Sequence, residues 1–288
     1  SAMEDVRDMQ EELEKEYYSL QEESIYAIKT SLATQWKEII QQLPELVEEA
    51  YHYDLLISLK QFIEAYQLSK PILAPQGISF VYGTNMNIAN ATPIEYYIGQ
   101  EEQTAIITGA NSGGKTTLLE LIGQIQILTH MGLYVPAKEA KVGLVEEIYY
   151  FSKNKGSLSA GAFETLLKQF STITDDDSKK LILADEIESV TEPDVAAKII
   201  KGIISHLRKS KHNTLLLVTH MGRELEKLQV QGRFDGIEAK GLDKNLNLVV
   251  DRNPVIGRVA RSTPQLIIER LAKLHGTPFY TELKKLVV

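Results

Sequence analysis

The sequence predicts an α/β protein in which a domain with a parallel sheet follows a long helical arm. From about residue 73 onward, short apolar runs typical of strands alternate with helix-like stretches, which is the pattern of parallel α/β units. Residues 4–43 contain no Gly or Pro and are rich in Glu, Gln, Lys and Leu, which predicts one long helix. A glycine-rich segment at 109–116 lies between an apolar run and a helix-like stretch.

The arm predicted over residues 4–43 would span roughly 60 Å at 1.5 Å per residue. Pro44 is expected to break it, with one or two further helices ending before Pro71. Residues 1–50 hold 13 acidic and four basic residues, a net charge of −9, whereas the rest of the chain has a net charge of +1. An acidic helix of this kind is more often a solvated spacer or a coiled-coil arm than a binding surface, and no broad basic surface for nucleic acid is evident.

The remaining elements follow from apolar runs and their boundary residues. The run 104–108 is β-branched and reads as a buried strand, and Leu118, Leu121, Ile122, Ile125 and Leu128 keep helical spacing before a stop at Gly132. Near the end of the chain, Ser262 or Thr263 would cap a helix with Pro264 in its first turn. The predicted strands are 78–83, 104–108, 180–185 and 214–220, and the predicted helices are 115–132, 193–209, 261–276 and a short one after Pro278.

The segment Gly109–Thr116 fits the phosphate-binding pattern G-x-x-x-x-G-K-[ST]. A strand, a glycine-rich loop and a helix N-terminus in this order place backbone N–H groups and the positive helix end around a phosphate. Lys115 would neutralise the β and γ oxygens, and the Thr116 hydroxyl would bind Mg²⁺. The alternative is a purely structural glycine turn. The candidate nucleotide-binding residues are Gly109, Ala110, Asn111, Ser112, Gly113, Gly114, Lys115, Thr116 and Thr117.

Two adjacent acids end the apolar run LILADE at 181–186. Asp185, at the carboxyl end of a strand beside the phosphate loop, is a candidate Mg²⁺ ligand. Glu186 is a candidate general base that orients the attacking water, which favours hydrolysis over transfer to a bound acceptor. The alternative is that one of the acids only caps the next helix.

A serine-bearing segment, GSLSAGAFETLL at 156–167, lies between these two motifs. A serine with N–H groups at a helix N-terminus can bind an anion, and this one would suit the γ-phosphate of a nucleotide held by a partner subunit. The alternative is an ordinary serine N-cap. His220, at the end of the apolar run 214–220, could sense the γ-phosphate, although a lone histidine at a strand end is usually structural.

The order of these motifs resembles the ABC-ATPase layout, and the detail resembles the ATPase domain of the MutS family of DNA mismatch-repair and recombination proteins. ITGANSGGKTTLLELIGQIQILTHMGLYVPA at 107–137 is similar to that family's I-T-G-P-N-M-x-G-K-S-T…G-x-x-V-P-A block. LADEIESVTEPD is similar to its D-E-[IL]-G-x-G-T segment, and VTH to its A-T-H. NPVIGRVARSTPQLIIERLAKLHG lies where that family has a dimerising helix-turn-helix. The resemblance covers most of the chain.

The resemblance implies an ABC-class P-loop ATPase domain and roles for particular residues. It implies phosphate contacts from Asn111 to Thr117, Mg²⁺ at Thr116 and Asp185, and a general base at Glu186. It also implies γ-phosphate sensing by His220 and a serine, Ser159, that acts on the partner subunit's nucleotide. The implied domains are a helical lever and core remnant at 4–72, the ATPase domain at 73–252, and a C-terminal helical dimerisation element at 253–288.

Several positions depart from the family pattern and indicate a divergent branch. Ala110 stands where the family has proline, and Ser112 where it has methionine. LSAG replaces S-T-F, and Glu188 and Val190 replace two glycines. No mismatch-binding domain is expected, because the chain has no room for one beside these motifs. A relative that lacks the mismatch-binding domain, acting in recombination control, branched-DNA or mismatch handling, is therefore the expectation.

The resemblance implies a homodimer that uses ATP and Mg²⁺ to open and close on DNA, with the DNA contacted through clamp regions outside this chain. The alternatives are an SMC-type ATPase, a transporter's nucleotide-binding subunit and a non-catalytic module that dimerises on ATP. The arm lies only upstream of the nucleotide motifs, which counts against the SMC type, and neither a Gln-bearing loop nor an intact L-S-G-G-Q is evident, which counts against a transporter.

Composition narrows the chemistry and the location. The chain has 288 residues and no cysteine, which excludes disulfides, thiolate metal sites and cysteine nucleophiles and fits a reducing compartment. No apolar run approaches the length of a membrane span, so no membrane partner is expected. The expected location is the cytoplasm, in association with the nucleoid if the source is bacterial or archaeal.

Overall fold

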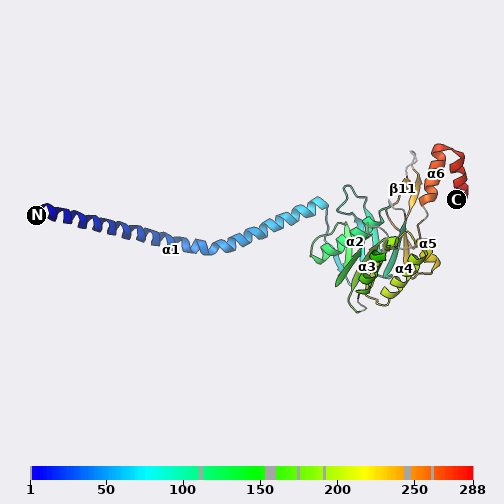
Figure 1. Cartoon of the computed structure of the whole chain (residues 1–288), viewed down its shortest axis with the longest axis horizontal. Helices are drawn as coiled ribbons and strands as arrows, with labels where there is room; N and C mark the ends of the chain where they lie inside the picture. The colour runs from blue at the N-terminus through cyan, green and yellow to red at the C-terminus, as the bar shows by residue number, and fades with distance from the viewer. Residues whose placement is uncertain are drawn as a thin grey trace. The chain divides into compact units, whose positions relative to one another are not determined.

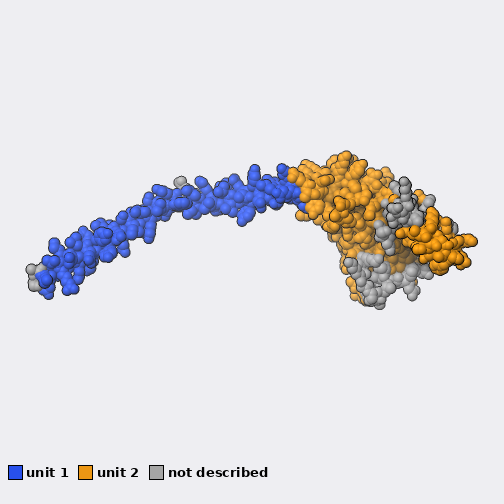
Figure 2. Space-filling view, turned by 90° about the horizontal axis from the view of Figure 1, so that it is seen from above, with its two compact units in different colours: residues 1–62 blue, residues 63–288 orange. Residues whose placement is uncertain are grey.

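The computed structural model describes residues 2–109, 113–152, 160–173, 176–190, 193–242, 248–260 and 263–287. The chain divides into two compact units, residues 1–62 and residues 63–288 (Figure 2). The first unit is made from most of one helix, and the second unit carries the sheets. No helix of the described residues combines the length and the apolar character that crossing a membrane requires.

Helix α1, Ala2–Tyr66, forms the first unit and ends within the second. The predicted break at Pro44 is wrong, because the helix continues through this residue and bends near its middle (Figure 1). A proline removes one backbone hydrogen bond and crowds the carbonyl four residues earlier, here that of Ile40. The side chains on either side of Pro44 are exposed, so water can hydrate that carbonyl, and the neighbouring Gln, Glu and Leu residues favour helix. A proline in this setting weakens the helix without ending it.

The second unit is organised around a six-stranded sheet with the order β12-β9-β4-β8-β7-β6. The neighbours from β9 to β6 are parallel, as predicted for α/β units, whereas β12 pairs antiparallel with β9. The strands are β4 Thr104–Gly109, β6 Glu147–Phe151, β7 Lys180–Asp185, β8 Asn213–Val218, β9 Arg233–Ile237 and β12 Val255–Ile256.

The strand predictions at 104–108 and 180–185 are confirmed, since β4 extends one residue further and β7 has the predicted bounds. The strand predicted over 214–220 begins one residue earlier and ends at Val218. Thr219 and His220 therefore lie beyond the end of β8.

Two apolar clusters cover the two faces of this sheet. On one face, alternate strand residues such as Ile107 and Leu183 pack with Leu118 and Ile122 of helix α2, Lys115–His130. On the other face, their neighbours such as Ile106 pack against residues of the next four helices along the chain. The sheet is thus buried on both sides, which explains why β4, β7 and β8 read as continuous apolar runs. The helices of this region are α2 Lys115–His130, α3 Ala160–Ser171, η1 Ile187–Val190, α4 Pro193–Leu207 and α5 Gly222–Lys227.

The predicted helices of this region form with small differences in length. Helix α2 begins at Lys115 as predicted, and it ends at His130 because Gly132 adopts a left-handed conformation with a φ of 72°. Helix α4 ends at Leu207, two residues before the predicted end. Gly132 has the backbone freedom that a helix stop requires.

A four-stranded mixed sheet with the order β1-β5-β2-β3 adds to the core on the α2 side. Its inward residues, including Phe80 and Val142, share a cluster with Leu121 of α2. The predicted strand at 78–83 is confirmed as β2. The strands of this sheet are β1 Ile72–Ala74, β2 Ile78–Gly83, β3 Ile94–Ile98 and β5 Glu139–Gly143.

The C-terminal part contains a two-stranded antiparallel hairpin and two helices. The hairpin strands are β10 Ala239–Leu242 and β11 Leu248–Val250. Helices α6, Thr263–His275, and α7, Pro278–Val287, confirm the two predicted short helices. Pro264 lies in the first turn of α6, and the alternative cap Ser262 is outside the described residues.

Candidate functional site

The glycine-rich loop connects the buried strand β4 to helix α2, as the motif predicts. Gly109 has a φ of 137°, and a Cβ atom there would lie 2.3 Å from the carbonyl oxygen of Ile237 on β9. Gly114 is the N-cap of α2 with a φ of 95° and makes no side-chain cap hydrogen bond. Both positions therefore require glycine, and the start of α2 has no side-chain cap that would compete with a phosphate. Ala110, Asn111 and Ser112 lie outside the described residues.

Lys115 is the first residue of α2 and is buried, with 2% of its surface exposed. Its Nζ donates a hydrogen bond of 2.8 Å to the carbonyl oxygen of Gly109 and lies 3.8 Å from Oε1 of Glu186. The first contact holds the ammonium group over its own loop. The second is longer than a direct hydrogen bond, so this ion pair is loose.

Thr116 and Asp185 bring two oxygen atoms together at the edge of the sheet. The Thr116 hydroxyl donates a hydrogen bond of 2.8 Å to Oδ2 of Asp185, the last residue of β7. Hard divalent cations prefer oxygen ligands, and Mg²⁺ is commonly bound through one or two protein oxygens together with phosphates and water. This pair fits such a site. Among the described residues, no cluster of three or more His, Cys, Asp or Glu residues forms a metal site of its own.

Glu186 follows Asp185 in a left-handed conformation with a φ of 46°, which is uncommon for a residue other than glycine. Its backbone N–H donates to the carbonyl oxygen of Val218, at 2.9 Å, so the end of β8 holds this turn. Its carboxylate is buried and contacts Nε2 of His220 as well as Lys115. An unusual backbone conformation held by neighbouring structure is a feature that concentrates at functional sites.

These residues converge because β4, β8 and β7 are adjacent and parallel. Ile107 of β4 and Asp185 of β7 both pair with Val218 of β8, so the three carboxyl ends lie side by side. The loop after β4, the acids after β7 and the histidine after β8 therefore meet at one edge. Ligands in open parallel sheets bind at this edge.

Glu188 lies in η1. In the sequence it was notable only because it replaces a glycine of the family pattern, and its contacts were not predicted. Its Oε1 accepts hydrogen bonds from the Thr219 hydroxyl at 2.7 Å and from the His220 backbone N–H at 2.8 Å. Thr219 also accepts a hydrogen bond from Met221 N–H at 3.0 Å. Glu188 therefore holds the turn that carries His220. No sequence signal could locate these bonds, because they join segments about thirty residues apart.

Tyr150, on β6, is a second residue that the sequence did not single out. Burial raises the pKa of its phenol to about 12, with smaller contributions from the charges of Asp185 and Glu120. The phenol is neutral at physiological pH, as an ordinary tyrosine is, and it lies within electrostatic reach of Asp185, the candidate metal ligand.

Ser159 lies outside the described residues, which resume at Ala160, the first residue of α3. Its predicted action across a subunit boundary therefore stays a prediction. Leu166 of α3 packs in the core. Thr117 lies in the first turn of α2, and its carbonyl oxygen accepts a hydrogen bond of 3.2 Å from the side chain of Asn85.

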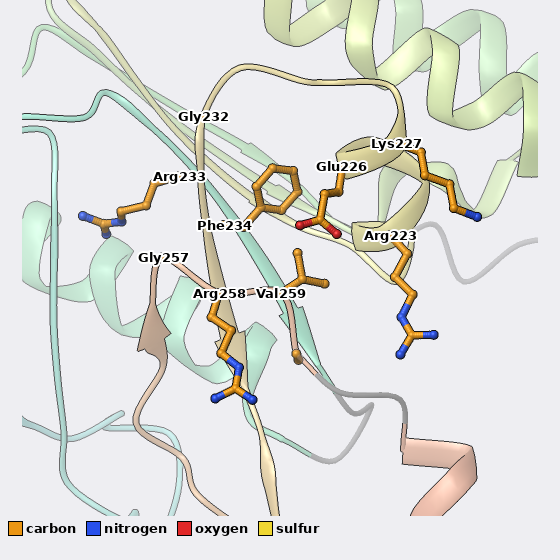
Figure 3. A pocket seen from close by; sticks show the side chains of 10 residues that line it. Arg223, Glu226, Lys227, Gly232, Arg233, Phe234, Gly257, Arg258 and Val259 are labelled. Carbon is orange, nitrogen blue, oxygen red and sulfur yellow. The ribbon is translucent and has the colours of Figure 1, made fainter. Parts of the chain in front are cut away.

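A separate hollow of about 600 Å³ is lined by α5, the start of β9 and residues 257–260 (Figure 3). Four cationic side chains line it, but Arg233 turns away toward Asp235, at 2.9 Å, and Arg258 lies 3.2 Å from Glu238. The remaining two, Arg223 and Lys227, share the hollow with Glu226. The hollow is therefore close to electroneutral and lacks the concentrated positive charge that would favour a phosphate.

Comparisons with known proteins relate this chain to MutS proteins. Residues 105–252 match a family model described as MutS domain V. The chain is 42% identical over 276 residues to the "DNA-binding protein MutS2" of Pyrococcus furiosus, covering 93% of this chain and 47% of that protein. It is 27% identical over 202 residues to the "Endonuclease MutS2" of Caldicellulosiruptor bescii, covering 66% of this chain and 26% of that protein. The chain thus spans about half the length, or less, of these curated relatives.

Proposed function

The chain belongs to the MutS domain V family, and from this premise we propose that it binds ATP with Mg²⁺ and hydrolyses ATP to ADP and phosphate. One observation carries the proposal: Lys115, the Thr116–Asp185 pair and the Glu186–His220 pair meet at the carboxyl ends of β4, β7 and β8. A cation, an oxygen pair and a buried carboxylate within one edge are the parts that phosphoryl transfer to water needs.

In the proposed complex the phosphate loop and Lys115 hold the nucleotide. Nζ of Lys115 is 3.8 Å from the Glu186 carboxylate, too far for a hydrogen bond, so Lys115 would exchange Glu186 for direct charge-assisted hydrogen bonds to the β and γ oxygens. The glycines at 109 and 114 allow the backbone to approach these oxygens closely. Thr116 and Asp185 would hold Mg²⁺, which supplies charge neutralisation of the phosphate oxygens.

The release of Glu186 from Lys115 leaves the carboxylate to His220 and to a water molecule. In the proposed reaction Glu186 accepts a proton from that water, whose oxygen attacks the γ-phosphorus as the bond to the β-phosphate oxygen breaks. His220, already in contact with Glu186, would orient the carboxylate and the γ-phosphate.

A phosphate-release assay with ATP and Mg²⁺ tests the proposal. We expect turnover in the wild-type protein, loss of turnover on addition of EDTA, and loss in an Asp185→Asn variant prepared in the same way. Absence of phosphate release together with retained ATP binding would instead support a non-catalytic module that dimerises on ATP. Family membership leaves the SMC-type and transporter alternatives without support.

We also propose that the active form is a dimer in which Ser159 serves the nucleotide of the partner subunit. Homodimers of Lys115→Ala and of Ser159→Arg should both be inactive. A mixed dimer combines both lesions in one site and leaves the other site intact, so mixing the two proteins should restore part of the hydrolysis. Sedimentation of the mixture with ATP must show a dimer, and a dimer without recovered hydrolysis would refute the shared site.

The wider proposal is that ATP-driven opening and closing of this dimer acts on DNA in recombination control, branched-DNA or mismatch handling. In it, residues 4–72 act as a lever, 73–252 as the ATPase domain and 253–288 as the dimerisation element, in the cytoplasm or at the nucleoid. DNA would be contacted through regions outside this chain. Binding of the full-length protein to duplex, mismatched and junction DNA at two salt concentrations tests this, because contacts to phosphates weaken as salt rises.

A further inference from the structure

Glu188 lies close to both the candidate general base, Glu186, and the candidate γ-phosphate sensor, His220. It lies two residues after Glu186 in the chain, and its carboxylate reaches back to the turn after β8. Both of its hydrogen bonds end on one oxygen, Oε1, and they come from consecutive residues, Thr219 and His220. Hydrogen bonds to an ionised carboxylate are stronger and shorter than neutral ones, so this contact fixes the turn firmly.

The turn is also held from its other side. The Thr219 N–H donates to the carbonyl oxygen of Ile107 on β4 at 3.0 Å, next to the phosphate loop. The Glu186 N–H donates to Val218 on β8. Thr219, the residue before His220, is therefore hydrogen-bonded to both β4 and η1. The imidazole of His220 contacts the carboxylate of Glu186.

We propose that Glu188 is a positioning residue that holds His220 against Glu186 through its two hydrogen bonds to Thr219 and His220. The claim rests on the proposed ATP hydrolysis, because His220 and Glu186 are given their roles there. It goes beyond the proposed function because Glu188 has no role in the reaction itself. Glu188 instead sets the position of His220 relative to Glu186. Small displacements of reacting groups reduce rates strongly, whereas nucleotide affinity depends on the loop and Lys115.

The first test separates turnover from binding. Glu188→Ala should lower kcat about tenfold or more while leaving the Kd for ATP unchanged, because only the His220–Glu186 geometry is disturbed. Glu188→Gln keeps an oxygen acceptor at the same place and should recover most of the kcat. Glu224→Ala, which removes an exposed carboxylate on α5, is the matched control and should behave as the wild type. Equal kcat in the wild type and Glu188→Ala would overturn the proposal.

The second test asks whether Glu188 acts through His220. In a His220→Ala background, Glu188→Ala should cause little additional loss of kcat, because the group that it positions is already absent. A further tenfold loss in the double variant would mean that Glu188 acts by another route and would overturn the proposal.

The third test does not depend on hydrolysis. The chain contains six histidines, and the imidazole resonances of His220 can be identified in ¹⁵N-labelled protein by their loss in His220→Ala. Glu188→Ala should shift these resonances, whereas Glu188→Gln and Glu224→Ala should leave them in place. Unshifted resonances in Glu188→Ala refute the positioning role. Shifted resonances in a protein without ATPase activity support positioning and refute the proposed function.

Discussion

Two buried carboxylates in the second unit differ in how they are held. Asp235, on β9, is completely buried and accepts hydrogen bonds from the Tyr96 hydroxyl at 2.6 Å, from Arg233 Nε at 3.0 Å and from the Gly257 N–H at 3.0 Å. Glu186 is also buried, and its carboxylate contacts Nε2 of His220. Lys115 Nζ is 3.8 Å away, and the backbone of Glu186 is in a left-handed conformation.

The partners of the two carboxylates also come from different kinds of structure. Asp235 joins β9 to β3 and to the segment after β12, all of which are parts of sheets or their direct extensions. Glu186 meets Lys115, at the start of α2 after the glycine-rich loop, and His220, in the turn after β8. A charge satisfied by short bonds within the sheets stabilises the fold. A charge whose partners lie in loops and at a helix start can exchange them when a ligand binds, which is what a nucleotide site requires.

The largest effect is expected at Lys115, because its loss should remove both ATP binding and hydrolysis and the glycine-rich loop contains no other cation. Lys115→Ala should weaken ATP binding by more than about 100-fold, since at least two charge-assisted hydrogen bonds to phosphate are lost. Calorimetric titration with ATP and Mg²⁺ measures this. Lys141→Ala, on the exposed face of β5, is the control and should bind as the wild type does. Equal affinity in Lys115→Ala would remove the phosphate-loop assignment.

Glu186→Gln should separate binding from chemistry. The amide has the shape of the carboxylate but cannot accept the proton of the attacking water, so we expect hydrolysis to slow by roughly 10²- to 10⁴-fold with the Kd for ATP retained. The ATP-bound form, and with it the dimer, should accumulate. Phosphate release and sedimentation with ATP check both points. A wild-type rate would place the base elsewhere.

Asp235→Ala should act on stability rather than on nucleotide chemistry. Without the carboxylate, the mostly buried Arg233 loses its ion pair and Tyr96 its acceptor. Loss of one partner of a buried pair costs about 3–5 kcal/mol, so the free energy of unfolding in urea should fall by that amount. A folded variant should keep its affinity for ATP. Loss of affinity in a folded protein would contradict the distinction drawn between the two carboxylates.

Tyr96→Phe isolates one bond of the Asp235 cluster. It removes the 2.6 Å hydrogen bond to Asp235 and should lower the free energy of unfolding by about 1.5–3 kcal/mol, the value typical of bonds to charged groups. Tyr97→Phe is the matched control. It keeps the ring on which Arg233 stacks, at 4.4 Å from the ring centroid, and should change the free energy of unfolding little. Comparable losses in the two variants would show that the bond is not what matters.

The smallest effect concerns pH and Tyr150. The pKa of its phenol is raised to about 12, mainly by burial and then by the charges of Asp185 and Glu120. Below pH 10 the phenol is neutral in both folded and unfolded chains, so its contribution to stability is complete. Between pH 10 and 12 the unfolded chain loses the proton first, and stability falls. The decline in the free energy of unfolding over this range should be shallower in Tyr150→Phe, and the alkaline absorbance titration of Tyr150 should move to lower pH in Asp185→Asn.

Much of the local structure follows from local pattern. The apolar run at 180–185 predicted β7 with its bounds, and the glycine-rich motif predicted a strand, a loop and a helix beginning at Lys115. These predictions succeed because strands buried on both faces and helix stops depend on residues close in the chain. The break at Pro44 was predicted by the same kind of reasoning and is wrong, because the cost of a proline depends on whether water can reach the freed carbonyl.

The sequence by itself determined the α/β class and the strand, glycine-rich loop and helix at 104–130. It also named the candidate site residues Lys115, Thr116, Asp185, Glu186 and His220. Only the tertiary structure decided that these residues meet, since strand order places the ends of β4, β8 and β7 side by side. It also decided that Glu188 accepts hydrogen bonds from the His220 turn and that the partners of Asp235 come from the sheets and their extensions. The physical reason is range: propensity and periodicity act over a few residues, whereas hydrogen bonds and ion pairs in a core join segments that only the packing of the sheet brings together.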